Sequence, residues 1–70
     1  MYRIGVDLGG TNIAAGIVNE EGVILYRASI PTGAHRPADD IVTDMAALCR
    51  SLINEANISI DEIAAVGIAS

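Results

Sequence analysis

The chain is 70 residues long and 51% hydrophobic, which allows one small folded domain and excludes a disordered tail. Its formal net charge is −5, with four arginines and no lysine, so we expect neither nucleic acid nor an anionic membrane surface as a partner. Charges and glycines interrupt the apolar runs, so no transmembrane span or signal peptide is expected. Cys49 is the only cysteine, and an unpaired thiol without an export signal indicates the cytoplasm.

Three runs of strand-forming residues open the chain. Tyr2–Leu8 and Asn12–Val18 flank a glycine-rich tip and predict a β-hairpin, and Val23–Ile30 follows a short polar turn as a third strand. Because short connections place neighbouring strands antiparallel, these three strands should form a meander.

The hairpin tip carries the residues with potential chemistry. Alternation along the first strand puts its apolar side chains on a core face and Gly5, Asp7 and Gly9 on the other, so bare backbone surrounds one carboxylate. Gly9 and Gly10 suit a tight turn and the close approach of a ligand. Consecutive peptide N–H groups in such a turn can bind an anion, and a nearby carboxylate can hold the magnesium that accompanies phosphate. The pattern favours a nucleotide-phosphate hairpin, and an ordinary Gly-Gly turn without a ligand is the alternative.

Two other phosphate-binding motifs are absent. Gly5 to Gly10 has the glycine spacing of a Walker A loop, but Thr11 and Asn12 stand where that motif requires lysine and then a hydroxyl residue. The G-x-G-x-x-G dinucleotide fingerprint is missing as well. Phosphate binding at this hairpin must therefore proceed without a P-loop lysine.

A loop at residues 31–37 separates the strands from a helical pattern over Pro37–Ala56. Pro37 suits the first helical turn, two aspartates there complement the helix dipole, and Asn57 suits a left-handed cap. The apolar stripe expected to face the core comprises Ile41, Val42, Met45, Leu48, Cys49, Leu52, Ile53 and Ala56. Cys49 is thus expected to be a packed thiol, and His35 is expected to be solvated, without a chemical role.

A short helical turn and a fourth strand follow. Ser59–Glu62 matches the capping-box pattern, and the apolar run Ala64–Ala69 predicts a strand buried on both faces. A strand, a crossover helix and another strand normally place the strands parallel, so this run should pair with the first strand. The predicted fold is α/β, β-β-β-α-β, with sheet order 3-2-1-4, strands 1–3 antiparallel and strand 4 parallel to strand 1. Since the helix covers only one face, we expect the chain to be an incomplete part of a larger domain.

The assembled residues resemble the N-terminal end of the ROK family of sugar kinases, and bacterial ROK glucokinases in particular. The matching segments are Ile4–Asn12 (IGVDLGGTN), Ala14–Val18 (AAGIV), Gly22–Leu25 (GVIL), Pro31–Thr32 and Ile63–Ser70 (IAAVGIAS). The core of the match, an acid before Gly-Gly-Thr at a hairpin tip, is shared more widely by the hexokinase, actin and Hsp70 group of ATPases.

The resemblance implies a ribonuclease H-like (actin-like ATPase) half-domain, with residues 1–70 as an incomplete N-terminal nucleotide-phosphate-binding lobe of a larger two-lobed kinase. It implies ATP-dependent phosphorylation of a hexose hydroxyl, with glucose the favoured sugar, by a full-length homo-oligomer. Asp7 would position Mg²⁺, and the residues facing the ATP phosphates would be Gly5, Asp7, Gly9, Gly10, Thr11 and Asn12. The family's catalytic base, an aspartate in a later Asn-Asp pair, does not occur in this chain, so no catalytic residue is expected here and no activity of the chain alone.

Two other functions stay open. Transcriptional repressors of the ROK family resemble the kinases, but they usually carry a helix-turn-helix segment before the hairpin and often a degraded phosphate loop. Here Met1 stands immediately before the first strand and the loop is intact, which favours a kinase. An actin-like or chaperone ATPase would hydrolyse ATP without a sugar. The amino-acid sequences of the hairpin tip and of Gly67–Ser70 resemble those of the sugar kinases more closely.

Overall fold

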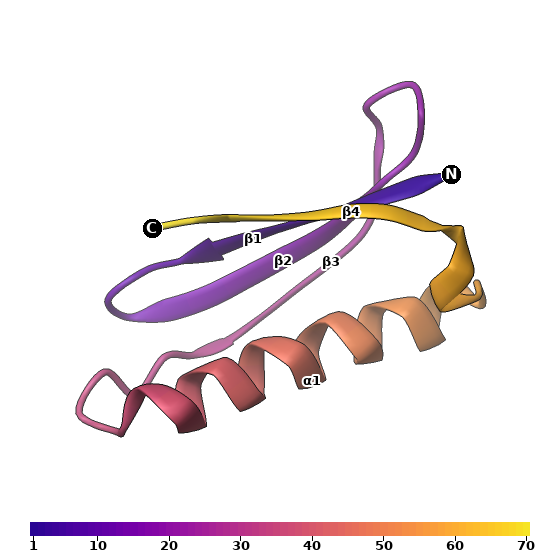
Figure 1. Ribbon diagram of the computed structural model, residues 1–70. Helices are drawn as coiled ribbons and strands as arrows, with labels where there is room; N and C mark the ends of the chain where they lie inside the picture. The colour runs from indigo at the N-terminus through magenta and orange to yellow at the C-terminus, as the bar shows by residue number, and fades with distance from the viewer.

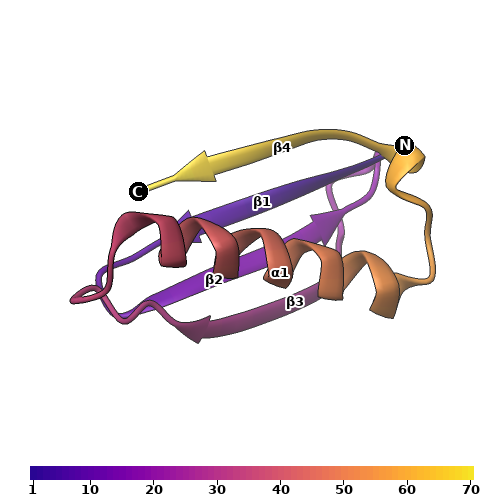
Figure 2. The same ribbon diagram turned by 60° about the horizontal axis from the view of Figure 1, so that its bottom comes forward.

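Four strands form one mixed sheet, and one long helix crosses a single face of it (Figures 1 and 2). The computed structural model describes all of residues 1–70. Its elements are β1 (Tyr2–Leu8), β2 (Asn12–Val18), β3 (Ile24–Pro31), α1 (Ala38–Ala56), the 3₁₀ turn η1 (Ile60–Glu62) and β4 (Ile63–Ala69). The strand order is β3-β2-β1-β4, with β4 parallel to β1 and the other pairs antiparallel, which confirms the predicted topology.

Strand β1 is internal and has one core face and one open face. Ile4 and Val6 are 2% and 4% exposed, whereas Gly5 and Asp7 are exposed. The alternation predicted from the sequence is thereby confirmed, because successive side chains of a strand point to opposite faces. It places Asp7 on the side of the sheet away from α1.

The core lies between α1 and the sheet. The helix packs over β2 and β3, and its partly buried residues include Cys49, as predicted. The buried hydrophobic residues are Ile4, Val6, Ile13, Ala15, Ile17, Met45, Leu48 and Leu52. Full burial of a large aliphatic side chain contributes about 1.5–3 kcal/mol, so this layer holds helix and sheet together.

The ends of α1 follow the capping signals with one difference. Asn57 adopts the left-handed conformation, with φ 57° and ψ 44°, and its N–H donates to helix carbonyls, which confirms the predicted cap. Pro37 is the N-cap and not part of the first helical turn, since its ψ of 147° is extended. Beyond the helix, Ser59 and Glu62 form the predicted capping box.

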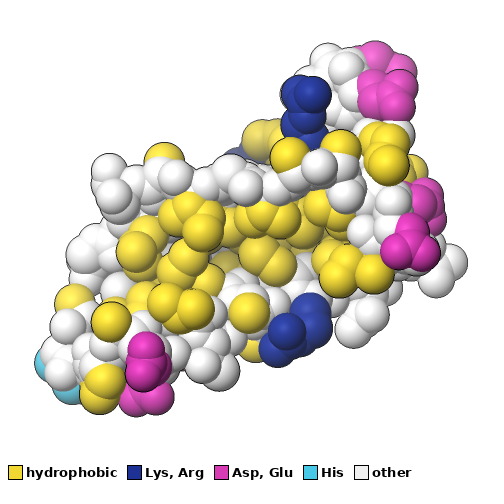
Figure 3. All heavy atoms as spheres, viewed as in Figure 1, with side chains coloured by type: hydrophobic (Ala, Val, Ile, Leu, Met, Phe, Trp, Pro, Cys, Tyr) yellow, Lys and Arg dark blue, Asp and Glu magenta, His cyan; other side chains and the backbone are white.

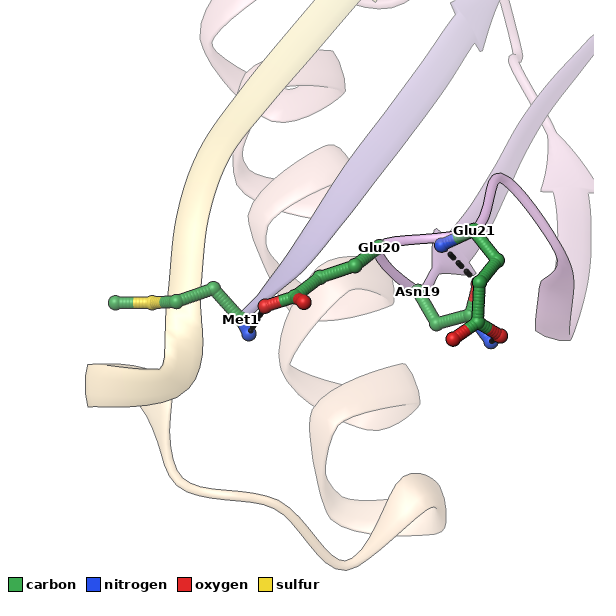
Figure 4. A network of polar contacts seen from close by, with 4 residues as sticks. All are labelled: Met1, Asn19, Glu20 and Glu21. Carbon is green, nitrogen blue, oxygen red and sulfur yellow. Dashed lines mark hydrogen bonds and ion pairs between the residues drawn. The ribbon is translucent and has the colours of Figure 1, made fainter.

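Strand β3 begins and ends one residue later than predicted. The Asn19 side-chain oxygen accepts hydrogen bonds from the N–H groups of Glu21 and Val23, each at 3.0 Å, so Val23 belongs to the turn. Figure 4 shows this turn near the N-terminus, where the Met1 ammonium contacts Glu20 at 2.6 Å. The strand ends on a proline, which an edge strand tolerates because the missing N–H breaks no ladder bond.

Strand β4 is not buried on both faces, contrary to the sequence prediction. Val66 and Ile68 are 52% and 60% exposed, because α1 lies over β2 and β3 and leaves this edge strand uncovered. Val42, which the prediction placed on the buried stripe, is 61% exposed for the same reason. Figure 3 shows the resulting apolar surface, a groove between α1 and the β1–β4 edge of the sheet. No helix of the chain is long and apolar enough to cross a membrane.

Candidate functional site

The tip of the β1–β2 hairpin presents unpaired backbone donors. The N–H of Gly9 donates to the carbonyl of Asn12 at 3.0 Å and closes the tip. The next two amides, those of Gly10 and Thr11, make no backbone hydrogen bond within the chain. The side chains of Thr11 and Asn12 are exposed beside them. Two consecutive free N–H groups next to a hydroxyl and a carboxamide can bind an anion.

The glycines of the hairpin differ in what the fold demands of them. Neither Gly9 nor Gly10 has a positive φ, so no left-handed backbone requires glycine at the tip. A Cβ added at Gly9 would lie 3.0 Å from the Asn12 carbonyl oxygen, so the close approach of the two chain segments favours glycine there. A Cβ added at Gly10 or at Gly5 would meet nothing within 4 Å. The tight-turn explanation is therefore wrong for Gly10, where the fold leaves open space.

Asp7 lies on the open face of the sheet, just before the tip. Its side chain is exposed, and the two ion pairs of the chain are made by other residues. Its cross-strand neighbours Ala14 and Ala69 are small, and they border a concavity of about 810 Å³ on this face. The chain contains no group of three or more metal-binding side chains. A single carboxylate such as Asp7 can take part in Mg²⁺ coordination together with water and ligand oxygens, which is a common coordination for this ion.

Thr32 is a residue of this site to which the sequence analysis gave no role. It is 3% exposed, its N–H donates to the Thr11 carbonyl at 2.8 Å, and its hydroxyl donates to the Gly9 carbonyl, also at 2.8 Å. The β2–β3 register pairs Asn12 with Pro31. Thr11, which precedes Asn12, and Thr32, which follows Pro31, therefore meet at the tip. Knowing this register would have indicated Thr32. However, a bulge between Ile17 and Val18 shifts the pairing by one residue from the register expected when residues are counted outward from the β2–β3 turn.

The other titratable groups considered in the sequence have structural explanations. His35 is exposed in the loop, and Asp39 and Asp40 are exposed in the first turn of α1. Burial raises the pKa of the Cys49 thiol, and the nearby Arg50 charge opposes this increase. A raised pKa and partial burial are typical of a packed thiol and not of a reactive nucleophile.

Comparison with known proteins identifies the family of this chain. Residues 3–70 match the profile of the ROK family. Over 29 residues the chain is 66% identical to the glucokinases of Streptomyces coelicolor and Streptomyces lividans, which is 41% of this chain and 9% of each relative. It is also similar to the crystal structure of a ROK family glucokinase from Streptomyces griseus in complex with glucose and AMPPNP, with a TM-score of 0.81 and 38% identity over 99% of this chain and 20% of that one.

Two more distant structures share the fold. One is Lmo2764, a putative N-acetylmannosamine kinase from Listeria monocytogenes, with a TM-score of 0.69 and 20% identity over 100% of this chain and 21% of that one. The other is the activator of 2-hydroxyisocaproyl-CoA dehydratase from Clostridium difficile with bound ADPNP, with a TM-score of 0.68 and 21% identity over 97% of this chain and 23% of that one. These similarities concern the fold, and they confirm the predicted actin-like ATPase architecture. Since the family profile extends over residues 3–70 and a ROK glucokinase shares this sheet and helix, the chain belongs to the ROK family.

Proposed function

We propose that residues 1–70 form the N-terminal phosphate-binding part of a lobe in a larger two-lobed kinase that transfers a phosphoryl group from ATP to a hexose hydroxyl. Glucose, giving glucose 6-phosphate, is the proposed sugar, because the Streptomyces relatives are glucokinases and one of them binds glucose and AMPPNP. The chain corresponds to only 20% of that structure, so the activity is proposed for the full-length protein and not for this chain alone.

The observation that carries the proposal is the pair of free amides at Gly10 and Thr11 close in sequence to the exposed carboxylate of Asp7. Phosphoryl transfer depends mainly on positioning the phosphates and neutralising their charge. Backbone donors can approach a phosphate closely at Gly10, because no side chain stands there and the surrounding space is open. The Thr11 hydroxyl and the Asn12 carboxamide add donors on the same tip.

Asp7 is the residue that would hold magnesium, through water and together with the phosphate oxygens of ATP. When bound, the ion supplies positive charge to the phosphates. No asparagine of the chain is followed by an aspartate, and Asp39 and Asp40 are explained by their place at the helix start. Because the resemblance to ROK kinases implies a general base in an Asn-Asp pair, we propose that the base for the sugar hydroxyl lies outside residues 1–70.

The test is Asp7→Asn in the full-length protein, assayed for ATP-dependent phosphorylation of a panel of hexoses with glucose first. The substitution removes the charge and keeps the shape, so turnover should fall about 10–100-fold, as is typical when a residue that orients a metal is lost. Asp61→Asn is the matched control, because Asp61 is an exposed carboxylate on η1. Equal activity of Asp7→Asn and the control would exclude the magnesium role, and ATP hydrolysis without transfer to any hexose would favour an ATPase.

We also propose a cytoplasmic, homo-oligomeric full-length protein. The free, partly buried Cys49 supports a reducing compartment. The oligomer follows from the resemblance to ROK glucokinases, and light scattering of the purified full-length protein measures it directly.

A further inference from the structure

A chain of hydrogen bonds connects the hairpin tip to helix α1. Thr32 holds the tip with its backbone N–H, at 2.8 Å from the Thr11 carbonyl, and with its hydroxyl, at 2.8 Å from the Gly9 carbonyl. The Arg36 guanidinium donates to the Thr32 carbonyl at 2.7 Å and forms an ion pair with Asp44 of α1 at 2.8 Å. Thr32 is the one buried polar residue of the chain, so its own bonds to the tip form where water has little access, whereas the Arg36–Asp44 pair is partly exposed.

The local backbone favours this arrangement. Gly33 has a φ of 60°, and a Cβ there would lie 2.6 Å from Nε of Arg36. Glycine therefore lets the arginine fold back over the turn, which the Arg36 N–H closes by donating to the Gly33 carbonyl at 2.9 Å. The arginine head can then reach both the Thr32 carbonyl and the helix.

The bond between the Thr32 hydroxyl and the Gly9 carbonyl fixes the direction of the free Gly10 amide. In a trans peptide the carbonyl and the following N–H lie in one plane and point in opposite directions, and the chain has no cis peptide. The Gly9 carbonyl points to the Thr32 hydroxyl, so the Gly10 N–H points away from it. The Thr11 carbonyl is held by the Thr32 N–H, which fixes the position of the tip at Thr11 without aiming a free donor, because the N–H of that peptide belongs to Asn12 of β2.

We propose that Thr32 is a positioning residue for nucleotide binding, because its hydroxyl holds the Gly9 carbonyl and so aims the free Gly10 N–H outward toward a phosphate group, while its own N–H anchors the tip at the Thr11 carbonyl. Arg36 and Asp44 hold Thr32 in place from α1. This inference rests on the proposed function, since the ligand at the tip is the phosphate of a nucleotide. Thr32 itself touches no ligand and acts through the backbone of Gly9 and Thr11.

The test compares Thr32→Val with Thr32→Ser in the full-length protein. Valine keeps the shape and loses the hydroxyl, whereas serine keeps the hydroxyl. We expect Thr32→Val to weaken binding of Mg-AMPPNP and to raise KM for ATP by about five- to tenfold, the effect of losing one hydrogen bond at a buried acceptor. Thr32→Ser should restore both values to near wild type. KM for the sugar should stay unchanged in both variants, which a general loss of structure would not produce.

Thr43→Val is the matched control, because the Thr43 hydroxyl also donates to a backbone carbonyl, that of Asp39, but on the exposed surface of α1. If Thr32→Val fails to fold, Arg36→Gln provides the second test, since it loosens Thr32 from α1 without changing the buried side chain. Its nucleotide affinity should fall in the same direction by a smaller factor.

Unchanged affinity for Mg-AMPPNP in a folded Thr32→Val variant, or an equal loss for sugar and nucleotide, would overturn the positioning role. The proposed function is judged separately on the wild-type protein. A wild type that binds Mg-AMPPNP but phosphorylates no hexose contradicts the kinase proposal, and the affinity comparison still decides the role of Thr32. A wild type that does not bind the nucleotide overturns both.

Discussion

Alanine should destabilise the protein at Gly9 but not at the neighbouring Gly10 of the hairpin tip. At Gly9 the new Cβ would lie 3.0 Å from the Asn12 carbonyl oxygen, which also accepts the Gly9 N–H. Both groups are backbone, so the hydrogen bond must lengthen or the strands must separate, at a cost of about 1–2 kcal/mol. At Gly10 the new Cβ meets nothing and φ is not positive. Alanine there should be neutral or stabilise by about 0.4–1 kcal/mol, because it restricts the unfolded chain.

The hydrogen-exchange rate of one amide, that of Gly9, distinguishes the effects of the two substitutions. The Gly9 amide is bonded across the tip, so its exchange rate reports local opening. Gly9→Ala should accelerate exchange of this amide in the full-length protein by about 5–30-fold, which corresponds to the estimated loss of 1–2 kcal/mol. Gly10→Ala should leave the rate unchanged or lower it. Equal effects of the two substitutions, or a larger one at Gly10, would refute the reasoning from the added Cβ.

Binding of Mg-AMPPNP provides the second half of this experiment. Gly10→Val places a branched side chain in the open space over which, on our proposal, a phosphate approaches. The affinity for Mg-AMPPNP should fall by about tenfold or more, because the phosphate and the valine side chain would compete for the same space. The hydrogen-exchange protection of the Gly9 amide should be retained. Wild-type affinity in Gly10→Val would show that no phosphate approaches Gly10.

Two further predictions concern titrating groups. The Cys49 thiol should react with iodoacetamide more slowly than a free thiol at mildly alkaline pH, because burial raises its pKa and lowers the thiolate fraction; rapid alkylation of the native protein would contradict this. The hydrogen bond and charge of the Met1 ammonium lower the pKa of the exposed Glu20 carboxyl from 4.5. A lowered pKa gives stability above the unfolded value that is lost as pH falls through the folded value. Glu20→Gln should therefore unfold slightly more easily than wild type at neutral pH and equally at strongly acidic pH, as followed by circular dichroism.

The sequence predicted the hairpin correctly because its signals are local. Apolar and polar residues alternate along β1, and this pattern alone determines that Ile4 and Val6 are buried and that Asp7 is exposed. The bounds of β1 and β2 and the left-handed cap at Asn57 agree with the structure for the same reason. Each of these features is set by residues within a few positions of one another.

The features that the sequence did not predict depend on contacts between distant segments. The start of β3 is set by the side chain of Asn19, which takes Val23 into the turn. Thr32 reaches the tip because a bulge in the β2–β3 pair changes the register, and no pattern in the sequence indicates that bulge. The exposure of Val66 follows from the lateral placement of α1 over β2 and β3, which hydrophobic periodicity does not determine. The apolar pattern of β4 predicts a buried strand but not the element that covers it.

The acidic composition of the chain explains why an oriented backbone should matter at this site. Residues 1–70 contain no lysine, and of the four arginines Arg36 is committed to Thr32 and Asp44. The concavity next to Asp7 is lined by a single cationic side chain, that of Arg27. On the proposed function, residues 1–70 would attract a phosphate at the tip mainly through N–H dipoles and through a magnesium ion that Asp7 would help to hold. A dipole, unlike a mobile ammonium group, is effective only in one direction, so the residue that fixes that direction becomes part of the binding site without touching the ligand.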